Sequence, residues 1–153
     1  MSDKNNLEAV AHYFSLVDHA NDSQKKFDEL IAIYSDDTES HSNDGSVSHG
    51  KEELIKNTRA FYDWMKGGES CHFYNVTRED GNIIEADWAV SAKLADGNVM
   101  ALGGHNVYEF DADHRIKKLI SLSGRRHTRR PKKAYIQSCL FPTSSLAFLP
   151  ALP

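Results

Sequence analysis

The sequence has 153 residues, the length of one domain, and its 40% hydrophobic and 26% charged content is ordinary for a globular protein. No apolar run approaches the roughly 20 residues that a membrane-spanning helix needs, so no membrane partner is expected. Residues 1–123 hold all 22 acidic residues but only 12 of the 18 Lys and Arg, a net charge of −10. This acidic body argues against nucleic acid as a partner of the folded domain.

The C-terminal residues differ sharply in composition from the rest. They contain no acid. Six closely spaced basic residues are followed by an apolar stretch that prolines interrupt; the basic residues are Arg125, Arg126, Arg129, Arg130, Lys132 and Lys133. We therefore predict one domain over residues 1–124 and a disordered tail over residues 125–153. The alternative is that the basic block binds RNA, DNA or an anionic surface. The first residues are polar and show no secretory signal, so we expect a cytoplasmic protein.

Helical patterns occupy the first half of the chain. Apolar residues recur at helical spacing from Leu7 to Asp18, and a second helix follows Ser23, whose hydroxyl is a suitable N-cap. Residues 38–42 read as a short strand and residues 43–46 as a turn. A third helix is predicted from about Lys51 to Lys66, where Gly67 and Gly68 follow it.

The second half alternates with the period of two that is typical of strands. Strands are predicted over residues 71–77, 84–94, 100–110 and 116–123, separated by Asp/Asn/Gly turns. One face of the two long strands is apolar apart from one amide, at Asn106. Helices followed by meandering strands indicate an α+β fold, with helices on one face of an antiparallel sheet.

Several motifs in this order resemble the SnoaL-like branch of the nuclear transport factor 2-like (NTF2-like) superfamily. They are His12-Tyr13-Phe14, Ala32-Ile33-Tyr34-Ser35-Asp36-Asp37, Gly50-Lys51-Glu52-Glu53-Leu54-Ile55, and Val107-Tyr108-Glu109-Phe110 before Arg115-Ile116. The resemblance covers roughly residues 7–124. It implies a cone-shaped α+β barrel, related to the cystatin-like fold, in which three helices pack on the concave face of a curved antiparallel sheet around one pocket.

Ketosteroid isomerase, a member of this superfamily, implies roles for particular positions. Its oxyanion-binding tyrosine falls on Tyr13, and its hydrogen-bond-donating aspartate falls on Asn106. Its general-base aspartate falls on Ser42, so the carboxylate base is missing and steroid-type isomerisation is disfavoured. The adjacent His41 is the candidate acid/base, because a neutral imidazole can abstract or shuttle a proton.

Each of these assignments has a structural alternative. His41 can instead be a half-exposed strand histidine that bonds a backbone carbonyl. Asn106 can have an internal partner, such as Tyr13 or a backbone group, instead of a ligand oxygen. Tyr13 can simply pack where the helix meets the sheet. The expected pocket walls can equally be core side chains: Trp88, Tyr108, Phe61, Tyr62, Met100 and Leu102.

The scattered histidines contain no pair at metal-ligand spacing, and no glycine-rich phosphate loop occurs, so no metal or cofactor is predicted. Two functions remain open. The first is a cofactor-independent isomerase, dehydratase or cyclase that acts by proton transfer on a small, partly apolar carbonyl compound. The second is a non-catalytic ligand-binding or dimerisation module. A homodimer through the convex sheet face is expected from its outward apolar residues Ala89, Val99, Ala101 and Val107.

Overall fold

The structure is a computed structural model that describes the backbone of residues 2–124 and the side chains from Asn5 onward. The predicted tail, residues 125–153, lies outside the described residues. Three helices are found: α1 (Ser2–Val17), α2 (Gln24–Ala32) and α3 (Gly50–Trp64). Ser23 is the N-cap of α2, as predicted, and its Oγ accepts a hydrogen bond from the backbone N–H of Lys26 at 3.2 Å.

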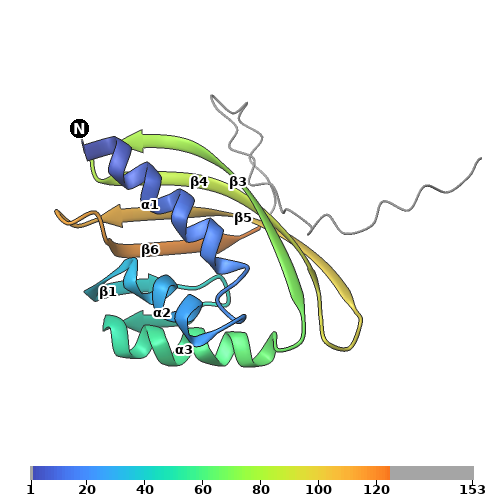
Figure 1. The fold of residues 1–153 in the computed structure, drawn as a ribbon. Helices are drawn as coiled ribbons and strands as arrows, with labels where there is room; N and C mark the ends of the chain where they lie inside the picture. Colours follow the sequence, from blue (N-terminus) through green and yellow to red (C-terminus); the bar gives the residue numbers. More distant parts are fainter. Residues whose placement is uncertain (1, 125–153) are drawn as a thin grey trace, which may run out of the picture.

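Six strands form one sheet: β1 (Tyr34–His41), β2 (Val47–His49), β3 (Glu69–Asp80), β4 (Ile83–Lys93), β5 (Val99–Phe110) and β6 (Ile116–Ser123). Their order is β2-β1-β6-β5-β4-β3. The helices cover one face, and the sheet curves around them without closing (Figure 1). The predicted α+β fold is therefore confirmed.

One strand pairing differs from the prediction of an antiparallel sheet. β1 runs parallel to β6, whereas the other neighbouring strands are antiparallel. A parallel pair requires a long crossover connection, and here the chain between β1 and β6 makes α3 and the β3–β5 meander. Because β1 and β6 are far apart in the sequence, no turn signal marks their pairing.

The strands place alternate side chains on opposite faces, as the period of two predicts. Ile84, Ala86 and Trp88 of β4 and Asn106 and Tyr108 of β5 are buried on the concave face. They join a core with residues from all three helices: Val10, Phe14, Phe27, Leu30, Leu54 and Tyr62.

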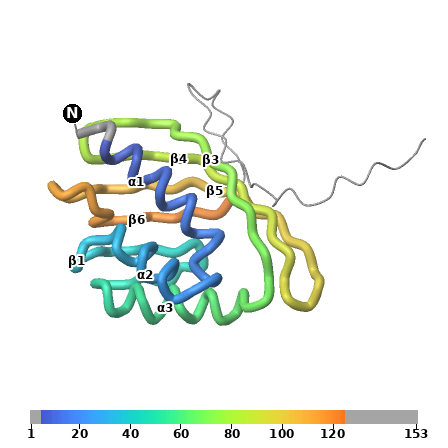
Figure 2. The backbone as a smooth tube through the Cα atoms, in the orientation of Figure 1, coloured from blue at the N-terminus to red at the C-terminus, as the bar shows by residue number. Residues whose placement is uncertain are grey.

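The strands β3, β4 and β5 are longer than β1, β2 and β6. β6 ends opposite Gly104, so the segment of β5 from Val99 to Gly103 continues beyond it together with β3 and β4. These three strands bend past the end of β6 toward the C-terminal end of α3 (Figure 2). Among the described residues no helix is long and apolar enough to cross a membrane.

Candidate functional site

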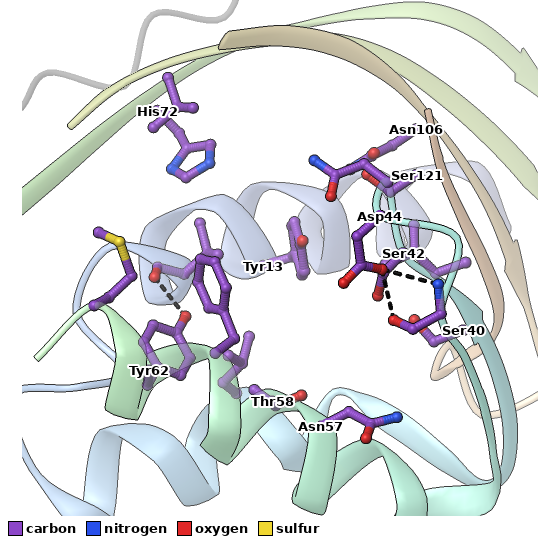
Figure 3. A pocket seen from close by; sticks show the side chains of 18 of the residues that line it. Tyr13, Ser40, Ser42, Asp44, Asn57, Thr58, Tyr62, His72, Asn106 and Ser121 are labelled. Carbon is purple, nitrogen blue, oxygen red and sulfur yellow. Dashed lines mark hydrogen bonds between the residues drawn. The ribbon is translucent and has the colours of Figure 1, made fainter. Parts of the chain in front are cut away.

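A cavity of about 280 Å³ lies between the helices and the concave face of the sheet. Its walls come from α1, α2, α3 and all six strands, and its interior is seen in Figure 3. Polar side chains occur at both ends. His72 of β3 extends into one end, while Ser40, Ser42, Asn106 and Ser121 gather at the other (Figure 3). Tyr13 of α1 lies between the two groups.

His72 is held by a buried carboxylate just past the end of α1. Its Nδ1 lies 2.6 Å from Asp18 Oδ1, and its backbone N–H donates to Asp18 Oδ2 at 2.8 Å. Ser70 Oγ donates to the same carboxylate at 2.6 Å. The side chain of Asp18 is 5% exposed. An ionised carboxylate is acceptor-only, so His72 donates from Nδ1 to Asp18, and its Nε2 has no hydrogen-bond partner among the described residues.

The pKa values of the nearby groups support this arrangement. Burial alone would raise the pKa of Asp18, but the hydrogen bonds from His72 and Ser70 hold it below its ordinary value. Asp18 is therefore ionised at neutral pH. Burial, with the charge of Asp18, raises the pKa of Tyr13 to about 12. The Tyr13 phenol consequently keeps its proton and can act as a hydrogen-bond donor.

Asn106 is oriented by its two neighbours. Trp88 Nε1–H donates to Asn106 Oδ1 at 2.9 Å, and Asn106 Nδ2 donates to Tyr108 Oη at 2.7 Å. Because an indole N–H can only donate, it fixes which end of the amide faces Trp88. Asn106 thus has internal partners, though neither is Tyr13. Its second N–H has no acceptor among the described residues, and Asn106 lines the cavity.

His41 also borders the cavity, but its ring is engaged by another residue. Its Nε2 lies 2.5 Å from Glu39 Oε1, and Glu39 in turn accepts from Lys118 Nζ at 2.7 Å. Along β1 the buried residues Thr38 and Ser40 alternate with Glu39 and His41. His41 therefore belongs to a charged group on the opposite side of the strand from Ser40.

The predicted pocket walls divide into two kinds. Five of the six line the cavity: Trp88, Phe61, Tyr62, Met100 and Leu102. Tyr108 is fully buried and is not among the lining residues, but its hydroxyl accepts a hydrogen bond from Asn106, which lines the cavity. Tyr62 donates its hydroxyl to the carbonyl of Val17 at 2.6 Å. Phe61 and its neighbour Trp64 are more than half exposed and form an apolar rim.

Several residues of the site were missed in the sequence. Asp18 and His72 are 54 positions apart, so no local spacing connects them. The signal that existed was the alternation of β3, which puts Ser70 and His72 on the face that Val76 buries. Within the described residues, no group of three or more His, Cys, Asp and Glu side chains is arranged to hold a metal ion.

Comparison with known proteins gives structural relatives. Neither a protein-family model nor a curated protein matches the sequence. The fold is similar to an NTF2-like protein of unknown function from Exiguobacterium sp. 255-15, with a TM-score of 0.68, 29% identity, and coverage of 77% of this chain and 99% of that one.

Two further structures resemble it at lower identity. A candidate polyketide cyclase from Xanthomonas campestris pv. campestris has a TM-score of 0.66 and 16% identity, and the match covers 80% of this chain and 92% of that one. The epoxide hydrolase/cyclase-like enzyme SalBIII, from a study of pyran ring formation in salinomycin, has a TM-score of 0.66 and 14% identity, over 81% and 95% of the two chains. At these identities the likeness concerns the fold.

Proposed function

We propose, from the premise that the chain has the NTF2-like fold, that it binds a small, partly apolar carbonyl compound in the cavity and transfers a proton within it. The proposal rests above all on the Asp18–His72 pair at one end of the cavity. The named relatives, a candidate polyketide cyclase and an epoxide hydrolase/cyclase-like enzyme, are consistent with this class of reaction.

The acid/base role moves from His41 to His72 in this proposal. Each histidine has one ring nitrogen on a carboxylate, but Glu39 is 35% exposed and also binds Lys118, whereas Asp18 is 5% exposed and holds His72 through Nδ1, which leaves Nε2 for a ligand. A histidine oriented by a buried carboxylate is the usual arrangement for a general base.

Trp88 sets the distance between the base and the oxygen-binding group. Its ring centroid lies 6.0 Å from that of His72, and its indole N–H binds Asn106. A small ligand that spans the indole can therefore present a C–H to His72 and its carbonyl oxygen to Asn106.

The chemistry follows from these positions. His72 Nε2 takes a proton from the carbon next to the carbonyl, and the electron pair of that C–H bond moves to give an enolate. The second N–H of Asn106 and the O–H of Tyr13 stabilise the enolate oxygen, a role for preorganised donors. Return of the proton from His72 to another carbon gives an isomer. In a ligand with a hydroxyl on the carbon β to the carbonyl, the enolate instead expels this hydroxide, which takes the proton from His72 and leaves as water, and a dehydration product forms.

Exchange of α-protons for deuterium in 2-tetralone, followed by NMR, tests this function. The wild-type chain should accelerate exchange, and His72→Gln should lower the rate by about 100-fold or more, the usual contribution of a general base. The control His12→Gln removes an exposed histidine of α1 and should leave the rate unchanged.

The competing outcomes are distinct. Loss of exchange in His41→Gln, with His72→Gln active, would return the acid/base role to His41. Binding of 2-tetralone without any acceleration by the wild-type chain would favour the alternative, a non-catalytic ligand-binding module.

A further inference from the structure

Serine side chains from three strands line the end of the cavity opposite His72. Ser40 of β1 pairs with Ser48 of β2 and, on its other side, with Leu119 of β6. Ser121 lies two residues beyond Leu119 on the same face and pairs with Asn106 of β5. We call Ser40, Ser48 and Ser121 the serine row, and all three line the cavity.

The hydroxyls of the serine row have unused hydrogen-bonding capacity. Ser40 is 5% exposed and Ser48 is 3% exposed. Within residues 5–124, the Oγ of Ser40 and of Ser121 have no hydrogen-bond partner, while Ser48 Oγ accepts from Asn57 Nδ2 at 2.8 Å and keeps its own hydrogen to donate. The hydroxyls of Ser40 and Ser121 are open to the cavity, so a ligand can reach them. A ligand oxygen at this end would satisfy these groups.

The charges around the cavity indicate whether the ligand oxygen at the serine row is neutral or charged. No Lys or Arg occurs among the lining residues, all of which lie in the described part of the chain. Asp44, in the turn between β1 and β2, lines the cavity beside Ser42 (Figure 3). Its carboxylate accepts hydrogen bonds from the N–H and the hydroxyl of Ser46 at 2.9 and 2.7 Å. Asp44 itself is exposed, so water screens its charge, but a carboxylate or phosphate on the ligand would find no Lys or Arg in the cavity wall to balance it.

The volume limits the size of the ligand. A cavity of about 280 Å³ corresponds to the liquid volume of about nine water molecules. It can hold a fused two-ring compound, with the apolar side chains Phe14, Leu54 and Val90 around the rings.

We propose that the ligand is an uncharged compound with two oxygen functions, a carbonyl that Asn106 and Tyr13 bind and a second hydroxyl or ketone that the serine row binds. This inference rests on the proposed function, because the binding of the ligand carbonyl by Asn106 and Tyr13 is part of that proposal. It adds the recognition of a second oxygen and the exclusion of acids.

Three probes of the same ring system test the inference: 2-tetralone, 6-hydroxy-2-tetralone and 2-tetralone-6-carboxylate. Their dissociation constants are measured with the full chain by isothermal titration calorimetry. The 6-hydroxyl should strengthen binding about tenfold, the effect of one or two hydrogen bonds. The 6-carboxylate should bind more weakly than the parent ketone.

Variants locate the effect in the serine row. Ser40→Ala combined with Ser48→Ala should remove the tenfold advantage of the hydroxylated ketone over 2-tetralone. If that double variant does not fold, Ser40→Ala alone should remove most of the advantage. Ser91→Ala is the matched control, because Ser91 is an exposed serine of β4.

The outcomes separate this inference from the proposed function. Equal binding of the two neutral ketones, or tighter binding of the carboxylate, overturns the inference while His72-dependent exchange of 2-tetralone still supports the proposed function. An advantage of the hydroxyl that survives in both serine variants also overturns it. Failure of all three probes to bind overturns both.

Discussion

Asp18 and Asp22 are both paired with histidines, but only one of the pairs is buried. The Asp18 side chain is 5% exposed, whereas Asp22, which lies 3.0 Å from His19 Nδ1, is 63% exposed. An exposed pair contributes little because water and salt screen it. A buried carboxylate depends on the hydrogen bonds that it accepts, so the protein should be far more sensitive at Asp18.

Asp18→Asn should destabilise the chain at neutral pH by about 1–3 kcal/mol, the cost of disrupting hydrogen bonds to a buried group. The pKa of Asp18 is lower in the folded chain than its ordinary value, so its contribution is present above about pH 4 and is lost as the pH falls through the lowered folded pKa. The difference in unfolding free energy between wild type and variant should therefore shrink between pH 7 and pH 3.

Urea denaturation across this range measures the effect. Asp22→Asn is the control and should change the free energy of unfolding by less than about 0.5 kcal/mol at every pH. A deficit in Asp18→Asn that stays constant down to pH 3 would contradict the lowered pKa of Asp18.

At the scale of elements, the pairing of β4 with β5 positions the amide of Asn106. Trp88 is paired directly with Gly104, and its indole lies over this residue to reach Asn106. A Cβ at position 104 would lie 2.5 Å from Cζ2 and 2.7 Å from Cε2 of Trp88, and it would also meet the backbone oxygen of Leu122. Because Gly104 of β5 has no side chain, the indole of Trp88 on β4 can lie over it.

Gly104→Ala should destabilise the chain by about 1–3 kcal/mol, because the methyl group forces the indole or the backbone of β6 to move. Thermal unfolding and the fluorescence of Trp88 should both change. Gly103→Ala is the matched control, since the added Cβ would meet only the carbonyl oxygen of Trp88, at 3.3 Å. Equal effects of the two substitutions would show that Gly104 does not accommodate Trp88.

At the scale of the whole molecule, the convex face of the sheet exposes several apolar side chains. Phe73 and Leu122 are 47% and 56% exposed, and the small residues Ala89 and Ala101 lie between their strands. The outward residues expected from the sequence, Ala89, Val99 and Ala101, are exposed, and Val107 is half-buried. Exposed apolar side chains on a sheet face can mark an interaction site, although His105 and Asp87 form an ion pair on the same face.

A homodimer through this face remains a prediction. Light scattering should give the mass of a dimer at tens of micromolar, and Phe73→Asp combined with Leu122→Lys should give a monomer with an unchanged melting temperature. Ile55→Lys on α3, also an exposed apolar residue, should stay dimeric. A wild-type chain that is monomeric throughout this range would contradict the prediction.

The sequence by itself determined the three helices and the faces of the long strands, but not β2 or the first residues of β1, which no pattern predicted. Helical spacing, the N-cap at Ser23 and the strand alternation are local patterns, and local patterns do not depend on the rest of the fold. They placed Asn106 on the concave face beside apolar residues, and they placed Tyr13 at the edge of its helix, where it lines the cavity.

The tertiary structure alone decided which of these residues meet. The parallel pairing of β1 with β6, the Asp18–His72 pair and the serine row join residues that are far apart in the chain, and burial of the whole core sets their distances. The state of His41 was decided in the same way. Its type suits a proton-transfer role, which stays a prediction; the structure adds that Glu39 binds its Nε2 and that Lys118 binds Glu39, from a strand that no local pattern placed next to β1.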